Sequence, residues 1–120
     1  MLSLGLLLHL HQPPTQFPEI LKLVVDQSYR PLLGLLAKHP QARLTMNVSG
    51  SLLGELDNRG YPDVISSLSG LVHKGQGEIS GGSIYHALLP RIPETEAIRQ
   101  ITLNELALDK YLDIVGPILN

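Results

Sequence analysis

The segment 2–14, LSLGLLLHLHQPP, decides how the rest of this 120-residue chain is interpreted. Residues 2–10 form a short and almost unbroken apolar run, which is typical of a strand buried on both faces in a parallel sheet. Pro13 and Pro14 follow, and proline cannot continue a strand ladder because it has no N–H to donate. We therefore predict a buried first strand over Leu2–Leu10 that leads into a loop.

Two histidines stand where this strand ends. His9 and His11 are two residues apart, so their side chains point to one face of a strand while Leu10 points to the other. Such a pair could bind a polar ligand through hydrogen bonds or act as two metal ligands. The simpler interpretation is that one imidazole is packed and the other solvated. The Gln12-Pro13 that follows favours the functional interpretation.

The rest of the chain alternates between helical and strand periods. Apolar residues recur at helical spacing or at alternate positions, with glycine or proline between the segments. The predicted elements are a helix over 18–38 that kinks or restarts at Pro31, a strand over 43–49, helices over 52–57 and 62–74, a strand over 77–80, and a helix from Glu94 to about Val115 that Gly116-Pro117 stops. This alternation predicts an α/β fold with parallel strands and βα repeats.

Three parallel strands can neither close a barrel nor cover their own edges. We therefore expect residues 1–120 to be a single partial domain, namely the first three βα units of a larger architecture. Open sheet edges also allow self-association, so a second copy of the chain is a candidate partner.

Polar side chains are also predicted near the ends of the other two strands. Asn47 could bond a sugar hydroxyl or fix the turn at Ser49-Gly50. Glu78 lies on a strand predicted to be buried, where a carboxylate needs a partner or a ligand. We expect His9 or His11 to be that partner across the sheet.

The loop after the third strand carries further candidates. Gly81 and Gly82 allow close backbone approach, and Tyr85 and His86 offer an aromatic face and two polar tips that suit a sugar ring. An ordinary loop anchored by its leucines explains the same residues, and the sequence leaves both interpretations open.

Composition excludes several classes of function. The net charge of −2 offers no broad basic surface for nucleic acid, and the absence of cysteine excludes disulfides and thiolate metal sites. No phosphate-binding or dinucleotide pattern is present, so no cofactor is predicted. Met1–Leu10 lacks a basic start and a cleavage site and is too short to span a bilayer, so we expect no membrane association and a cytoplasmic location.

Two ordered motifs resemble glycoside hydrolase family 57. The first is a His-x-His-Gln-Pro-like segment at the end of the first strand, here His9 to Pro13. The second is a Gly-Gln-x-Glu-Ile-like segment with an aromatic-His-x-x-Leu-Pro tail, matched by Gly75, Gln76, Glu78, Ile79, Tyr85, His86, Leu89 and Pro90. Segments 29–32 and 44–53 are also similar to the family, so the similarity covers nearly the whole chain.

The resemblance implies the N-terminal portion of an incomplete (β/α)7 barrel that acts on α-glucans with retention of configuration and needs no metal. By similarity, His11 and Glu78 would hold the sugar at the cleavage subsite, with the other candidates near them. The complete predicted substrate-binding set is His9, His11, Gln12, Asn47, Glu78, Tyr85 and His86.

The carboxylates depart from the family pattern. Retaining hydrolysis needs two carboxyl groups about 5–5.5 Å apart, a nucleophile and an acid/base. The family takes these from a Glu on the fourth strand and an Asp further along, which we expect beyond residue 120. Glu78 cannot serve as both groups, and the carboxylates at 55, 57 and 63 are predicted on the outer, helical side. We therefore expect no catalytic residue in this chain and no turnover by it alone.

Two alternatives belong to other classes. Polysaccharide deacetylases share a related barrel and bind a metal ion, for which His9, His11 and Glu78 would be the ligands, although their Asp-Asp pair near the first strand is missing. The second alternative is a non-catalytic, self-associating carbohydrate-binding module.

Overall fold

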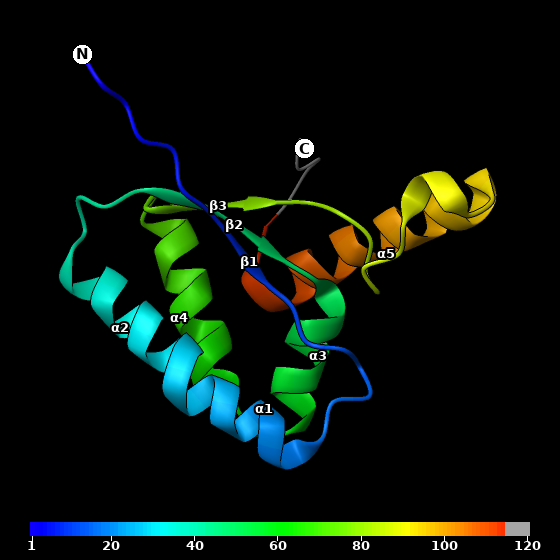
Figure 1. Ribbon diagram of the computed structural model, residues 1–120, viewed down its shortest axis with the longest axis horizontal. Coiled ribbons are helices and arrows are strands. Elements are labelled where there is room, and N and C mark those ends of the chain that lie inside the picture. Colours follow the sequence, from blue (N-terminus) through cyan, green and yellow to red (C-terminus); the bar gives the residue numbers. More distant parts are fainter. Residues whose placement is uncertain (115–120) are drawn as a thin grey trace.

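The structure is a computed structural model that describes residues 1–114. The elements in chain order are β1 (Leu7–Leu10), α1 (Pro18–Val24), the π-helical turn η1 (Val25–Tyr29), α2 (Arg30–Lys38), β2 (Leu44–Val48), α3 (Gly50–Asn58), α4 (Pro62–His73), β3 (Gly77–Ser80), the 3₁₀ turn η2 (Leu89–Arg91) and α5 (Glu94–Leu112). This order confirms the predicted alternation. In Figure 1, α1 to α4 all lie on one side of the sheet.

The strands form one parallel sheet in the order β1-β2-β3, as the alternation predicted. Alternate residues face the helices, and of these Leu10, Met46 and Ile79 are buried. The opposite face carries the intervening positions, where His9 pairs with Asn47 and Asn47 pairs with Ser80. The register therefore places these three polar side chains in one row across the sheet.

The first strand is shorter and more exposed than predicted. It covers Leu7–Leu10, and only Leu10 is buried. Leu7 is exposed because it lies on the face of the sheet that the helices do not cover. The segment before it runs away from the sheet (Figure 1), and Leu2 and Leu4 are exposed. The prediction of a strand over Leu2–Leu10 buried on both faces is therefore wrong.

The predicted disturbance at Pro31 takes the form of a π-helical turn. Proline cannot donate the usual helical hydrogen bond. The turn η1 just before it widens the helix, and the Arg30 N–H bonds the Val25 carbonyl five residues back. The Arg30 side chain then bonds Asp26 and, through two nitrogens, Asp63 on α4. This junction ties the first helical segment to α4.

The middle of the chain follows the sequence closely. Ser49 caps α3, because its hydroxyl accepts the Leu52 N–H. Pro62 opens α4 as predicted, and Gly75 adopts a positive φ of 72° in the turn that follows. The Gln76 side chain is buried and donates to the carbonyls of Leu36 and His39, which joins the end of α2 to the start of β3.

The last helix buries one narrow face that includes two polar residues. Its buried residues are Gln100, Asn104, Leu108 and Leu112, spaced four apart, whereas the apolar Ile98 and Leu106 are exposed. The helix ends at Leu112, and Asp113 takes the left-handed conformation that stops it. The expected end near Val115 and the stop at Gly116-Pro117 lie outside the described residues.

None of the helices within residues 1–114 combines the length and the apolar character that a membrane span requires. The core lies between the sheet and the helices, and leucines from α3 and α4 supply much of it, including Leu52, Leu53, Leu56 and Leu68.

Candidate functional site

Three histidines meet at the carboxyl end of β1. The rings of His9 and His11 lie 5.8 Å apart between centroids and are nearly parallel, which confirms that both face the same way. His86 packs against both, at 4.9 Å from His9 and 4.4 Å from His11. The predicted pair is therefore part of a cluster of three imidazoles, which we call the histidine cluster.

His86 reaches the histidine cluster through an unusual backbone conformation. Its φ is 58°, in the left-handed region that residues other than glycine rarely adopt. The loop is held just before this residue, because Ile84 N donates to the Gln100 carbonyl, Tyr85 N donates to the Gln100 side chain, and Ser51 N donates to the Ile84 carbonyl. Strain of this kind persists only where the surrounding structure fixes it.

The surroundings of His11 favour its neutral ring. Burial lowers the pKa of the His11 imidazole, and the neighbouring His86 and His9 lower it further. The His11 Nδ1 atom is buried and has no hydrogen-bond partner within the described protein. A neutral imidazole carries one donor and one acceptor, so the cluster can offer both to a polar ligand.

Asn47 connects the histidine cluster to the sheet. Its Oδ1 lies 2.8 Å from His9 Nδ1, and its Nδ2 donates to Ser80 Oγ at 3.0 Å. The same nitrogen also reaches the carbonyl oxygens of Ser80 and Gly81. Among the described residues, Asn47 therefore ties His9 to the end of β3 and does not fix the Ser49-Gly50 turn, which was the structural role expected from the sequence. A sugar contact by Asn47 stays a prediction.

Glu78 does not meet the histidines. It shares their face of the sheet but pairs in register with Thr45, two residues nearer the start of the strands than Ser80. The side chain is exposed rather than buried, and within residues 1–114 it forms no ion pair. The expected partnership with His9 or His11 is therefore wrong, since His86 occupies that place. A sugar contact by Glu78 stays a prediction.

The other two candidates flank the histidine cluster. Gln12 is half-buried just after His11, and its side-chain oxygen accepts from Gln16 Nε2 at 2.7 Å, which stiffens the loop after β1. Tyr85 precedes His86 and is 53% exposed, so its ring face is open to a ligand.

Two residues that support the site were not found from the sequence. Gln100 holds the backbone of the loop that carries His86, and the buried Asn104 accepts the Gly50 N–H at 2.8 Å. The sequence does contain a signal for them, because Gln100 and Asn104 are amide side chains four residues apart on a helical face that is otherwise apolar. Their targets are backbone atoms on distant segments, which no local pattern reveals.

The described residues can be searched for the metal site that one alternative requires. Within residues 1–114 no three His, Asp or Glu side chains are placed so that they could hold one metal ion. The set of His9, His11 and Glu78 that a deacetylase-like site requires is not assembled. Three imidazoles, the Asn47 amide and an exposed tyrosine instead offer hydrogen bonds and a flat ring to a polar, uncharged ligand.

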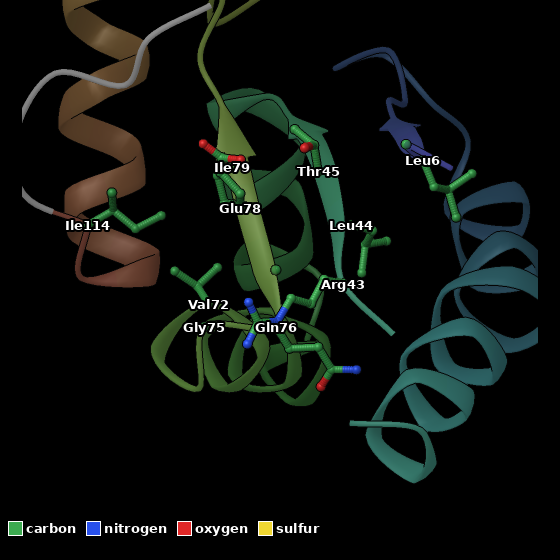
Figure 2. A pocket seen from close by; sticks show the side chains of 12 residues that line it. Leu6, Arg43, Leu44, Thr45, Val72, Gly75, Gln76, Glu78, Ile79 and Ile114 are labelled. Carbon is green, nitrogen blue, oxygen red and sulfur yellow. The ribbon is translucent and has the colours of Figure 1, made fainter. Parts of the chain in front are cut away.

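A hollow lies at the amino ends of the strands, away from the histidine cluster. It has a volume of about 700 Å³ and is lined by residues such as Arg43, Gln76 and Glu78 (Figure 2). None of the three histidines lines it. Glu78 therefore lines this hollow, and it lies on the face of the sheet that also carries His9 and Asn47.

Comparison with known proteins identifies the family to which the chain is similar. The sequence pattern described as Glycosyl hydrolase family 57 matches residues 7–116. Alpha-amylase 1 of Dictyoglomus thermophilum is 34% identical over 110 residues, which are 91% of this chain and 16% of the amylase. The 4-alpha-glucanotransferase of Thermococcus litoralis is 31% identical over 96 residues, which are 80% of this chain and 14% of the transferase. The chain therefore spans 14 to 16% of the length of these two relatives.

Solved structures agree with the sequence matches. The crystal structure of the Thermococcus litoralis 4-alpha-glucanotransferase superposes with a TM-score of 0.82 and 28% identity, over 88% of this chain and 17% of the transferase. The branching enzyme of Thermococcus kodakaraensis superposes with a TM-score of 0.73 over 92% of this chain and 31% of the enzyme, and at 18% identity it shows the fold alone. These matches confirm the predicted fold class, in which parallel βα repeats form part of a (β/α)7 barrel.

Proposed function

The chain belongs to glycosyl hydrolase family 57, and from that membership we propose that its histidine cluster is part of the sugar-binding subsite of a retaining enzyme active on α-glucans. The relatives it matches are named as α-amylases and 4-α-glucanotransferases, so the proposal covers both hydrolase and glucanotransferase activity. The single observation that supports it best is the meeting of His9, His11 and His86 at the carboxyl ends of the strands.

The geometry suits a sugar because the groups are polar and close together. The pKa of His11 is lowered, so its neutral ring can both donate to and accept from hydroxyl groups. In this proposal Tyr85 lies against a sugar ring, and Gln12, Asn47 and Glu78 stand around the histidines as further contacts or supports.

We also propose that the nucleophile and the acid/base lie outside these 120 residues. Glu78 is the one carboxylate on a strand within the part of the chain that the structure describes. The carboxylates of α3 and α4 lie on the helical side, where Glu55 pairs with Arg59 and Asp63 pairs with Arg30. A retaining mechanism needs two carboxyl groups facing one bond, and Glu78 alone cannot provide them.

Incubation of the purified 120-residue chain with maltoheptaose tests this part of the proposal. No reducing sugar and no change in chain length should appear, even at high protein concentration. Dose-dependent release of reducing sugar that follows the purified protein through a final chromatography step would overturn it.

Binding is tested separately by calorimetric titration with maltoheptaose, with the β-linked cellohexaose as the ligand control. His11→Ala should weaken binding of maltoheptaose at least several-fold, because it removes one of the three rings of the histidine cluster, the one whose Nδ1 atom has no partner within the described protein. His39→Ala is the matched control, since this exposed histidine lies at the far end of α2 and should leave the affinity unchanged. Equal affinities of both variants would contradict the proposed site.

Two further parts of the proposal concern the oligomeric state of the chain and its location in the cell. Both outer strands of the sheet have a free edge among the described residues, which supports self-association through these edges. The cytoplasmic location expected from the sequence stays a prediction, and fractionation of cells that express the chain tests it.

A further inference from the structure

The orientation of the Asn47 amide can be deduced from its surroundings. Its Nδ2 lies 3.1 Å from the Gly81 carbonyl oxygen, 3.3 Å from the Ser80 carbonyl oxygen and 3.0 Å from Ser80 Oγ. Carbonyl oxygens only accept hydrogen bonds, so the group that faces them must be the NH₂. The reversed amide would place an oxygen against two other oxygens. The Oδ1 atom is therefore the one that faces β1.

This orientation determines where the proton of His9 resides. Asn47 Oδ1 lies 2.8 Å from His9 Nδ1, and an amide oxygen can only accept. The Nδ1 atom must therefore carry the hydrogen. A neutral imidazole has one protonated nitrogen, so Nε2 keeps its lone pair.

The amide is well placed to hold this arrangement. Asn47 is half-buried on the central strand, in register with His9 on one side and Ser80 on the other. Three acceptors on and after β3 fix its nitrogen end, so its oxygen end cannot rotate away from His9 without losing them. An outer group that fixes one imidazole nitrogen sets the role of the other.

We propose that Asn47 is a positioning residue that locks His9 in the tautomer protonated at Nδ1, so that His9 Nε2 accepts a hydrogen bond from a sugar hydroxyl. The second half of this statement rests on the proposed function. The first half concerns the protein alone. Each half therefore has its own measurement.

The tautomer is measured without sugar. Long-range ¹H–¹⁵N correlation spectra of the ¹⁵N-labelled chain at mildly alkaline pH distinguish the two forms of each imidazole, and His9→Asn identifies the His9 signals by their loss. His9 should be protonated at Nδ1. Asn47→Ala should shift it toward the Nε2-protonated form that a free imidazole prefers.

Ser80→Ala is the matched variant, because it removes one acceptor of Asn47 Nδ2 and leaves both carbonyl acceptors in place. It should keep the Nδ1-protonated form. An Nε2-protonated His9 in the unaltered chain would overturn the proposal, even if Asn47→Ala fails to fold. So would an unchanged tautomer in a folded Asn47→Ala.

The proposed hydrogen bond from a sugar hydroxyl to His9 Nε2 is tested by titration with maltoheptaose. The His9 Nε2 signal should move on saturation, and Asn47→Ala should bind about tenfold more weakly than Ser80→Ala. A locked tautomer combined with equal affinities of the two variants would overturn the positioning role. If maltoheptaose does not bind the unaltered chain at all, the proposed function fails, while the tautomer result stands or falls by its own spectrum.

Discussion

Individual side chains determine the geometry of the histidine cluster and the lowered pKa of His11. The spacing of His9 and His11 was sufficient to predict that they share a face, because that is a local property of a strand. The contact of His86 with these two rings could not be predicted, since it depends on the positive φ of His86 and on backbone contacts of its loop with α5. The expected contact of Glu78 with these histidines was wrong, because the strand register places Glu78 two residues before Ser80, the residue that pairs with Asn47.

At this scale we predict a loss of stability in mild acid. The pKa of His11 is lowered in the folded state, so the unfolded chain binds the proton more readily. The free energy of unfolding should therefore fall as the pH drops through the unfolded-state value of about 6.5, and the fall should level off below the folded-state pKa. Urea unfolding at several pH values between 8 and about 5 measures it.

The matched variants are His11→Asn and His39→Asn. The first should flatten the loss of stability in this pH range, because it removes the residue whose pKa is lowered by burial and by two neighbouring rings. The second should keep the loss, since His39 is exposed and lies away from the histidine cluster. The same pH dependence in all three proteins would rule out His11 as its cause.

Helices and strands contribute to the site mainly through their ends and through one polar face. Apolar periodicity predicted the type and order of the elements, since burial repeats along each of them. The burial of Gln100 and Asn104 on α5 could not be predicted, because their hydrogen-bond partners are backbone atoms on other segments of the chain. A local apolar pattern carries no information on such partners.

For the loop that carries His86 we predict that Gln100→Ala increases its mobility. The change removes the side-chain acceptor of Tyr85 N, next to the residue with the strained backbone. Amide hydrogen exchange at Tyr85 and His86 should become faster, while exchange in α4 stays unchanged. Glu105→Ala, an exposed change on the same helix, is the control, and equal exchange in both variants would contradict the role of Gln100.

For the contact between α3 and α5 we predict that Gly50→Ala is destabilising. A Cβ at this position would lie 2.6 Å from the Ala107 Cβ and 3.2 Å from Asn104 Oδ1. The helices must move apart to admit it, at a cost of about 1–3 kcal/mol in the free energy of unfolding. Urea unfolding measures this cost.

Gly34→Ala is the control for that change. Its added Cβ would meet nothing within 4 Å on exposed α2, so the higher helix propensity of alanine should raise stability by about 1 kcal/mol. A Gly50→Ala protein as stable as Gly34→Ala would show that the contact between α3 and α5 is loose.

The whole molecule presents a three-stranded sheet with one face covered by helices. The strand count predicted open edges, and the order β1-β2-β3 confirms that β1 and β3 each have one free edge among the described residues. Periodicity alone could not predict the (β/α)7 barrel, because it describes strands one at a time. The family motifs supplied that assignment, and the superposed structures confirm it.

At this scale we predict self-association through the edge of β1. Light scattering after size exclusion should give a dimer or a larger species. Leu7→Lys should shift the population toward monomer, because Leu7 lies on the edge strand and is 63% exposed. Leu35→Lys, on α2 and 56% exposed, should leave it unchanged. A monomer of the unaltered chain at high concentration would contradict this prediction.

The central claim, that an α-glucan binds at the histidine cluster, is tested most directly by following the imidazole signals of all five histidines during titration with maltoheptaose. We expect saturable shifts at His9, His11 and His86, no shift at His39 or His73, and intact maltoheptaose at the end. Shifts confined to His39 and His73, or no shift at any histidine at saturating sugar, would contradict the claim.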